Sequence, residues 1–270
     1  MAINGLASCM PPNTESSLYV DDFAVFTSSA SLPSADRRLQ LANNAAYHWS
    51  QCSGFNFSSK TVSMHFARLR GVFPPPCFKL GASEITHVAE TKFLRMIIDS
   101  KLYWTSHIRD LRIRCLKALQ LLTCLSHFRW GADRTTLLRV YRSLARSHLD
   151  YGCQIYGSAT ASTLKTLDPV HHQALRIATG AFRSSPVISL YAGRPSLAFR
   201  RDKLTLQMYV RILGMPRTPA HSVLTSTEHD PLYATHNYHA PLGYRARQLL
   251  LSLNLEPPAV LPSFEYITPQ

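Results

Sequence analysis

Two adjacent carboxylates stand out in the sequence because apolar residues flank them on both sides. Asp21 and Asp22 lie between Leu18-Tyr19-Val20 and Phe23-Ala24-Val25-Phe26. Apolar runs around a short acidic break are typical of a β-hairpin, which would place the pair at or beside its tip. Neighbouring strand residues point to opposite faces, so both carboxylates reach one ligand only if the turn redirects one of them. Such a pair favours a hard divalent cation such as Mg²⁺, whereas an ordinary Asp-rich turn is the alternative.

The string Tyr19-Val20-Asp21-Asp22 resembles the metal-binding hairpin in the palm domain of reverse transcriptases. Three later segments extend the likeness to reverse transcriptases of jockey-type non-LTR retrotransposons, with matching order and spacing over about residues 1–215. These segments are Gly54–Thr61, Phe93–Leu102 and Leu149–Cys153. The resemblance implies RNA-templated DNA synthesis with two divalent ions, Mg²⁺ or Mn²⁺. It also implies an RNA template, a DNA primer and deoxynucleoside triphosphates as partners.

The resemblance assigns roles to single residues of this amino-terminal part. Asp21 would be the principal metal ligand and Asp22 its helper, while Tyr19 and Val20 would lie near the primer and the nucleotide. Lys60 would serve the triphosphate, where an ammonium group can offset developing charge or give a proton to the leaving pyrophosphate. From the sequence alone, a solvated loop lysine is an equally good interpretation of Lys60.

Short strands are expected at Cys77–Leu80, Ile85–Val88 and Lys92–Ile98, where the chain resembles the family's primer-gripping hairpin. The family usually has Gly where this chain has Arg95, and Gly would permit a tight turn. The family's first metal-binding aspartate and its template-contacting Pro-Gln-Gly motif would both lie before Met1. We therefore expect two of three palm carboxylates in this chain, and negligible polymerisation by the chain alone.

The charge balance of the chain indicates a polyanionic partner. A formal net charge of +13 and a pI near 9.7 suit nucleic acid or an anionic membrane surface. No run approaches the roughly 18 apolar residues that a membrane span requires, and no signal peptide is apparent. We therefore expect an intracellular protein that binds nucleic acid, with a nuclear site of action implied by the resemblance. The six cysteines form no C-x-x-C pair and are expected to be reduced.

The positive charge is concentrated in residues 101–150, which hold ten Lys or Arg and three Asp, a net 10 − 3 = +7. A helix is expected from Asp133, a natural N-cap. Its apolar face would carry Leu137, Tyr141, Leu144 and His148. Nearly the opposite face would carry a row of Arg139, Arg142 and Arg146. An exposed cationic face is often simply solvated, but no Glu is interleaved to neutralise this row, so we favour phosphate binding. The expected nucleic-acid-binding residues are Arg109, Arg112, Lys117, Arg139, Arg142 and Arg146.

The expected fold class is α+β. Residues 1–102 would form a partial reverse-transcriptase palm of antiparallel hairpins and helices. One helix would start at Ser34 and stop at Gly54, with a core stripe of Leu39, Ala42, Ala46 and Trp49. Residues 103–214 would form an all-α thumb-like bundle, with one further helix from Asp168 to a stop at Gly180 and another starting at Ser196. Residues 215–270 would be a proline-rich linker-like tail whose one clear helix is Tyr244–Leu253. Two other functions stay open, a non-catalytic nucleic-acid-binding module and a decayed transposon copy. The oligomeric state is not predicted.

Overall fold

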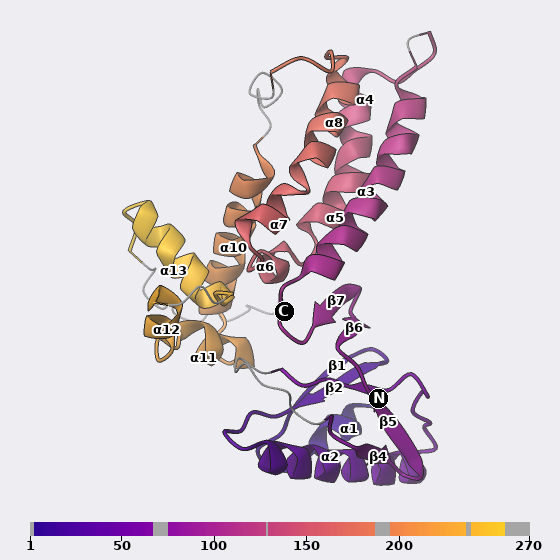
Figure 1. The fold of residues 1–270 in the computed structure, drawn as a ribbon, viewed down its shortest axis with the longest axis vertical. Helices are drawn as coiled ribbons and strands as arrows, with labels where there is room; N and C mark the ends of the chain where they lie inside the picture. The colour runs from indigo at the N-terminus through magenta and orange to yellow at the C-terminus, as the bar shows by residue number, and fades with distance from the viewer. Residues whose placement is uncertain (1–2, 67–74, 128, 187–194, 236–238, 257–270) are drawn as a thin grey trace, which may run out of the picture. The chain divides into compact units, whose positions relative to one another are not determined.

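The computed structural model describes residues 3–66, 75–127, 129–186, 195–235 and 239–256 (Figure 1). The chain divides into two compact units, Met1–Lys101 and Leu102–Gln270. Among the described residues, the first unit combines two helices with seven short strands, and the second is entirely helical. The expected α+β class is confirmed. The expected tail prolines Pro257, Pro258 and Pro262 lie outside the described residues.

The first unit contains the expected hairpin around the two carboxylates. Strand β1 (Glu15–Tyr19) pairs antiparallel with β2 (Asp22–Phe26), and Tyr19 lies opposite Asp22. Only Val20 and Asp21 connect the strands, so the loop has the shortest length that antiparallel strands commonly use. Helix α1 (Asn4–Ser8) contacts β1, and α2 (Leu32–Ser53) contacts β2. The hairpin prediction is therefore confirmed.

Helix α2 starts earlier than expected but ends where expected. Ser31 takes the N-cap position and a proline occupies the first turn, where its missing N–H costs no hydrogen bond. Gly54 ends the helix with a left-handed φ of +71°. On the inner face Ala42 and Ala46 are buried, whereas the expected core residues Leu39 and Trp49 are only half-buried.

Helix α2 also covers an open sheet edge. The three-stranded sheet has the order β3 (Val62–Ser63), β5 (Ser83–His87) and β4 (Phe78–Leu80), so β4 is an edge strand. The Gln40 side chain accepts a hydrogen bond from the Lys79 N–H and donates one to the Lys79 carbonyl, both at 2.9 Å. One amide thus satisfies backbone groups that would otherwise invite pairing with another strand.

The strand expected at Lys92–Ile98 is instead a complete hairpin. Strand β6 (Glu90–Phe93) turns into β7 (Met96–Asp99) through Leu94 and Arg95 alone. Both loop residues have positive φ, +45° and +64°. This combination matches the twist of antiparallel strands and is normally supplied by Asn-Gly or Gly-Gly. The pattern of apolar residues predicted one continuous strand here, because Leu and Arg are not among the residues that typically form turns.

The second unit is built on a helical bundle. Helix α3 (Thr105–Leu125) packs against α4 (Arg134–Tyr141), the π-helix η1 (Arg142–Arg146), α5 (Ser147–Asp150) and α8 (Asp168–Thr179). Figure 1 shows these segments side by side. The N-cap of α4 is Asp133, as expected, and α8 ends at Gly180, as expected. The main buried side chains of α3 are Ile108, Leu111, Cys115, Leu119 and Leu122.

The helix after Asp133 begins where expected but does not keep its expected register. A π-helical turn at 142–146 inserts one extra residue per turn, which rotates everything that follows. Leu144, expected in the core, is 38% exposed, while Ala145 and Leu149 are buried. His148 is only half-buried. The expected apolar stripe is therefore wrong after Tyr141.

The segment expected to be a tail forms three helices, α11 (Pro219–Thr225), α12 (Asp230–Thr235) and α13 (Leu242–Ser252). Helix α13, close to the expected helix, packs against α10 (Leu197–Leu213) around Tyr209, Leu213, Ala246 and Leu250. The short helices α6 (Cys153–Tyr156) and α7 (Ala161–Lys165) complete the unit.

One arginine ties the three carboxy-terminal helices together. The Arg247 guanidinium donates to the Asp230 carboxylate at 2.6 Å and to the carbonyls of Leu224 and Ser226. Proline does not break these helices, because Pro219 and Pro231 lie in first turns, where the helix needs no N–H from them. The number of prolines alone predicted a linker-like tail, whereas their positions in first turns are compatible with α11 and α12.

Replacing Arg95 with Gly should raise the free energy of unfolding of the first unit by about 0.5 to 1 kcal/mol. A left-handed conformation costs an L-residue about 1 to 2 kcal/mol, and the extra chain entropy of Gly offsets part of that gain. Hydrogen exchange of the β6 and β7 amides measures the effect. Lys92→Gly, an equally exposed basic residue within β6, is the control and should lower protection; equal losses for both variants would contradict the turn.

Candidate functional site

The hairpin loop holds two neighbouring carboxylates in solvent. Asp21 and Asp22 are both exposed, and the adjacent Tyr19 and Val20 are 63% and 73% exposed. Asp22 is the first residue of β2, while Asp21 lies within the turn. The turn therefore removes Asp21 from the strict alternation of strand side chains, as a shared ligand would require. Carboxylate oxygens of this kind suit hard divalent cations.

The loop carries backbone strain next to these carboxylates. Val20 has a φ of +58°, a left-handed conformation that is unusual for a β-branched residue. Such a residue costs about 1 to 2 kcal/mol and persists only where the surrounding structure imposes it. Here the β1–β2 pairing imposes it, since two-residue loops need a positive φ at their first position or at both.

Lys60 lies in an exposed turn between α2 and β3, as expected from the sequence. Its backbone N–H donates to the Ser58 hydroxyl at 3.2 Å, which fixes the turn while the ammonium group faces solvent. Within the described residues, no group of three or more His, Cys, Asp or Glu side chains is arranged to hold a metal ion. The carboxylate pair is thus a partial ligand set.

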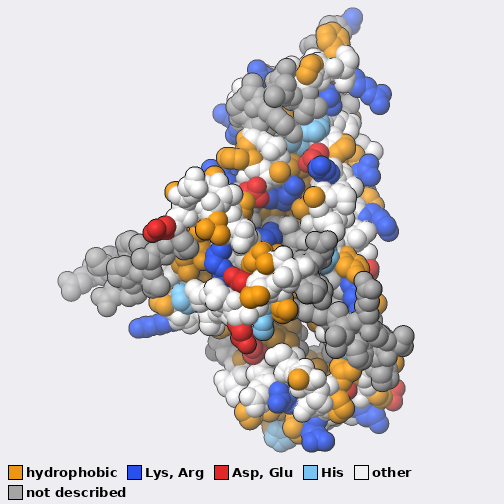
Figure 2. All heavy atoms as spheres, turned by 60° about the vertical axis from the view of Figure 1, so that its left-hand side comes forward, with side chains coloured by type: hydrophobic (Ala, Val, Ile, Leu, Met, Phe, Trp, Pro, Cys, Tyr) orange, Lys and Arg blue, Asp and Glu red, His pale blue; other side chains and the backbone are white. Residues whose placement is uncertain are grey.

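The expected basic residues of the second unit divide into two groups. Arg109, Arg112 and Lys117 are exposed on α3, outside its buried stripe, and Arg139 and Arg142 are also exposed. We call these five residues the cationic set. Figure 2 shows Lys and Arg side chains spaced along the helical part of the molecule.

Arg146 departs from the expected row because the π-helix turns it toward the bundle. Its side chain is 14% exposed, and its Nε lies 3.8 Å from the Asp150 carboxylate. Arg146 is therefore close to a carboxylate and largely shielded from solvent, so we leave it out of the cationic set.

Each of the three acids in residues 101–150 is engaged with groups outside the cationic set. Asp110 pairs with Arg114 at 2.9 Å. Asp133 accepts hydrogen bonds from Thr135 and Thr136 at the start of α4, and the bonds from Thr136 lower the pKa of its carboxyl. Asp150 binds Arg200 through two guanidinium nitrogens at 3.2 and 2.9 Å. The positive charge of the cationic set is therefore not offset by these carboxylates.

The segment Leu149–Cys153, which carries part of the family resemblance, joins three helices. Asp150 links α5 to α10 through Arg200, and Gly152 turns the chain into α6 with a φ of +67°. Burial raises the pKa of the Cys153 thiol to about 12. Tyr156 donates a hydrogen bond to the Leu149 carbonyl. These contacts position the helices and expose no reactive group.

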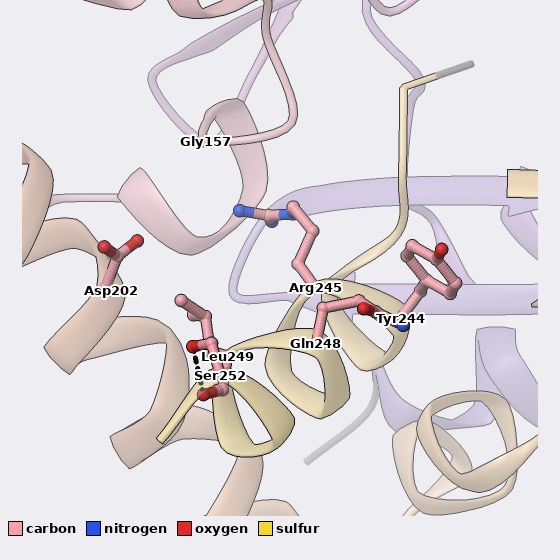
Figure 3. A pocket seen from close by; sticks show the side chains of 7 residues that line it. All are labelled: Gly157, Asp202, Tyr244, Arg245, Gln248, Leu249 and Ser252. Atoms are coloured by element: carbon pink, nitrogen blue, oxygen red, sulfur yellow. Dashed lines mark hydrogen bonds between the residues drawn. The ribbon is translucent and has the colours of Figure 1, made fainter. Parts of the chain in front are cut away.

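A groove of about 360 Å³ in the second unit lies between α6, α10 and α13 (Figure 3). Its polar lining is mostly used within the fold. The Arg245 guanidinium donates to the carbonyls of Gln154 and Ala240, and Ser252 donates to the Leu249 carbonyl. Burial and the nearby Arg201 and Arg245 act in opposite directions on Asp202, with burial raising its pKa. We assign this groove to helix packing.

Two histidines are buried in the helical bundle. Burial lowers the pKa of His171 to about 4, and its Nδ1 lies 2.5 Å from the Tyr141 hydroxyl. Burial also lowers the pKa of His107. His171 and His107 are therefore core residues of the bundle, whereas His172 is half-buried.

Comparison with known proteins points to one class. Matches at modest identity are RNA-directed DNA polymerases of mobile elements, so the chain is related to a segment of the reverse transcriptases of jockey-like non-LTR retrotransposons. No protein-family model matches the chain, and no solved structure matches it.

Three individual relatives define this relationship. The jockey polymerase of Drosophila melanogaster is 27% identical over 164 residues, which is 60% of this chain and 18% of the relative. The probable X-element polymerase of the same species is 26% identical over 123 residues, 46% of this chain and 13% of the relative. The jockey polymerase of Drosophila funebris is 24% identical, again over 60% and 18%. The chain thus spans less than a fifth of the length of these relatives.

The stability of the helical unit should fall as the pH drops from neutral to about 4. The unfolded state takes up a proton on His171 near its ordinary pKa of 6.5, whereas the folded state does so only near 4. Between these values the free energy of unfolding falls by up to about 1.4 kcal/mol per pH unit, and His107 adds a loss in the same direction.

Urea unfolding followed by circular dichroism measures this slope. His171→Gln should make it shallower, because Gln does not titrate. His229→Gln, at an exposed position, is the matched control and should leave the slope unchanged. Identical slopes in all three proteins would contradict the buried neutral histidine.

Proposed function

We propose that this chain forms part of an RNA-directed DNA polymerase of the jockey type. Residues 1–102 would contribute late elements of the palm, and residues 103–214 the thumb. The observation that carries the proposal is the two-residue hairpin that exposes Asp21 and Asp22, in a chain related to such polymerases. Tyr19 and Val20, exposed beside the carboxylates, would contact the primer end or the nucleotide.

The carboxylate pair fits Mg²⁺ or Mn²⁺ in part. Mg²⁺ commonly binds one or two carboxylates and completes its octahedral shell with waters and substrate phosphates. Asp21 and Asp22 would supply the protein ligands, and the ions would neutralise charge on the triphosphate and on the attacking and leaving oxygens. Lys60, with its ammonium in solvent, would contact the triphosphate.

We further propose that the 270-residue chain by itself polymerises negligibly. Two carboxylates without a third acidic or imidazole neighbour in the described residues hold two ions poorly, because a shared ligand is missing. The chain would then act through nucleic-acid binding, as a partner or remnant of a larger enzyme.

None of the helices in the described part of the chain is long and apolar enough to cross a membrane. By analogy with its relatives, we propose action in the nucleus.

The cationic set would hold the backbone of the template–primer duplex. Five Lys or Arg contacts to phosphates would give a slope of about −3.5 to −4.5 in a plot of log affinity against log salt. This charge distribution equally favours a second candidate function, a non-catalytic module that grips duplex nucleic acid. The two functions differ in whether the hairpin carboxylates matter.

Mn²⁺ should bind the chain weakly and through the hairpin. Electron paramagnetic resonance of Mn²⁺ titrated with protein is expected to show a bound fraction that Asp21→Asn and Asp22→Asn together abolish, because amides are poorer ligands for hard cations. Glu84→Gln removes an exposed carboxylate on β5 of the same unit and should leave binding unchanged.

Primer extension on an RNA template with a DNA primer, nucleotides and Mg²⁺ or Mn²⁺ complements this measurement. No product above background is expected from the 270-residue chain. Strong synthesis that depends on Asp21 would overturn the proposed inactivity, and Mn²⁺ binding that ignores both Asp→Asn changes would overturn the metal site.

Replacing Arg109, Arg112 and Lys117 together with Gln should weaken binding to an RNA–DNA duplex and reduce the salt slope by about 2 to 3, since each lost phosphate contact removes about 0.7 to 0.9. Fluorescence anisotropy at several salt concentrations measures both quantities. Lys203, Arg211 and Arg217, also exposed in the second unit, changed together to Gln form the charge-matched control. Equal effects of the two triple variants would show that net charge, rather than the cationic set, governs binding.

A further inference from the structure

The loop between α3 and α4 displays an aromatic pair at the end of the bundle. Trp130 is 66% exposed, although Trp is among the side chains that gain most from burial. Its ring stacks on His127 with centroids 5.0 Å apart and planes 14° from parallel. One indole face is thus covered by the imidazole, while the side chain as a whole remains open to solvent.

Backbone hydrogen bonds link the described residues of this loop that precede and follow Trp130. The Gly131 N–H donates to the His127 carbonyl at 2.6 Å, and the Ala132 N–H donates to the Leu125 carbonyl at 2.8 Å. A Cβ at Gly131 would lie 2.2 Å from the His127 carbonyl oxygen, so only Gly permits this approach. These contacts restrain the backbone on the carboxy-terminal side of Trp130, which lowers the chain entropy that this part of the loop would lose on binding.

The surroundings of the aromatic pair are basic. Arg129 precedes Trp130 in the chain, Arg134 begins α4 four residues after it, and both are exposed. The nearby acid, Asp133, uses its carboxylate to cap α4 through Thr135 and Thr136. Figure 2 shows basic and hydrophobic side chains together at the upper end of the helical part. An anion with an apolar face would match this combination of charges and ring surface.

We propose that Trp130 is a stacking platform for an unpaired base of single-stranded nucleic acid, with Arg129 and Arg134 contacting the flanking phosphates. Base faces within a duplex are already covered by their neighbours, so an exposed indole selects unpaired bases or strand ends. The platform extends the proposed nucleic-acid function to a separate site and ligand form. It depends neither on the hairpin carboxylates nor on the cationic set.

Binding of oligo(dT) to the full 270-residue chain tests the platform through tryptophan fluorescence. Trp104 is buried and Trp49 half-buried, so quenching by the oligonucleotide should come from Trp130. Trp130→Ala should remove the quenching and weaken binding measured by anisotropy about tenfold, within the range known for a lost base stack. Trp130→Tyr should retain most affinity because it keeps a ring.

Two further variants make the result specific. Gly131→Ala should also weaken oligo(dT) binding, because the loop must shift to admit the Cβ. Phe199→Ala removes another exposed aromatic ring, 62% exposed on α10, and should change nothing. Unchanged oligo(dT) affinity in Trp130→Ala would overturn the platform.

The same proteins separate this inference from the proposed duplex binding. Trp130→Ala should leave RNA–DNA duplex affinity within about twofold, since that interaction uses the cationic set. If the unmodified chain shows Trp130 quenching by oligo(dT) but does not bind the RNA–DNA duplex, the thumb proposal alone is refuted. If sedimentation shows that Trp130→Ala instead dissociates an oligomer of the chain while oligo(dT) affinity is unchanged, the ring serves a protein contact and the platform is wrong.

Discussion

The shortness of the β1–β2 loop governs the chemistry available to this chain, because it keeps two anionic side chains adjacent and in water. Two residues leave no room for the backbone to relax, and the strain falls on Val20 rather than on a glycine. The repulsion between Asp21 and Asp22 adds to this cost. A cation would relieve the repulsion without changing the backbone, which is why the metal site is proposed at this loop.

The helical unit solves a different electrostatic problem, that of a strongly basic surface. Two of its acids stabilise the fold: Asp133 starts a helix, and Asp150 joins two helices through Arg200. A third, Asp110, pairs with Arg114 rather than with the exposed cations of α3. The same charge distribution therefore holds the bundle together and leaves a positive field outside it, which is what a polyanion requires.

The sequence predicted well those features that depend on local chemistry. The β1–β2 hairpin, the Asp133 cap and the Gly54 and Gly180 helix ends all follow from residues with strong intrinsic preferences. The features it missed are set by tertiary context. Nothing in Leu94-Arg95 signals a turn, and the anchoring of α11, α12 and α13 depends on one guanidinium reaching residues about 20 positions away. The palm and thumb assignments, the roles of single site residues and the domain limits remain predictions.

The π-helical turn at Arg142–Arg146 changes which side chains this segment turns toward the core. It brings Ala145, a side chain small enough for close approach, against α3, where the Cys115 thiol donates to the Ala145 carbonyl at 3.5 Å. Burial raises the pKa of Cys115 to about 11, so the thiol keeps the proton that it donates. The sequence nevertheless retains Leu144 at the position that an uninterrupted helix would bury. The same sequence is thus compatible with two core registers. An uninterrupted α-helix would bury Leu144, whereas the π-helical turn buries Ala145 and turns Arg146 inward.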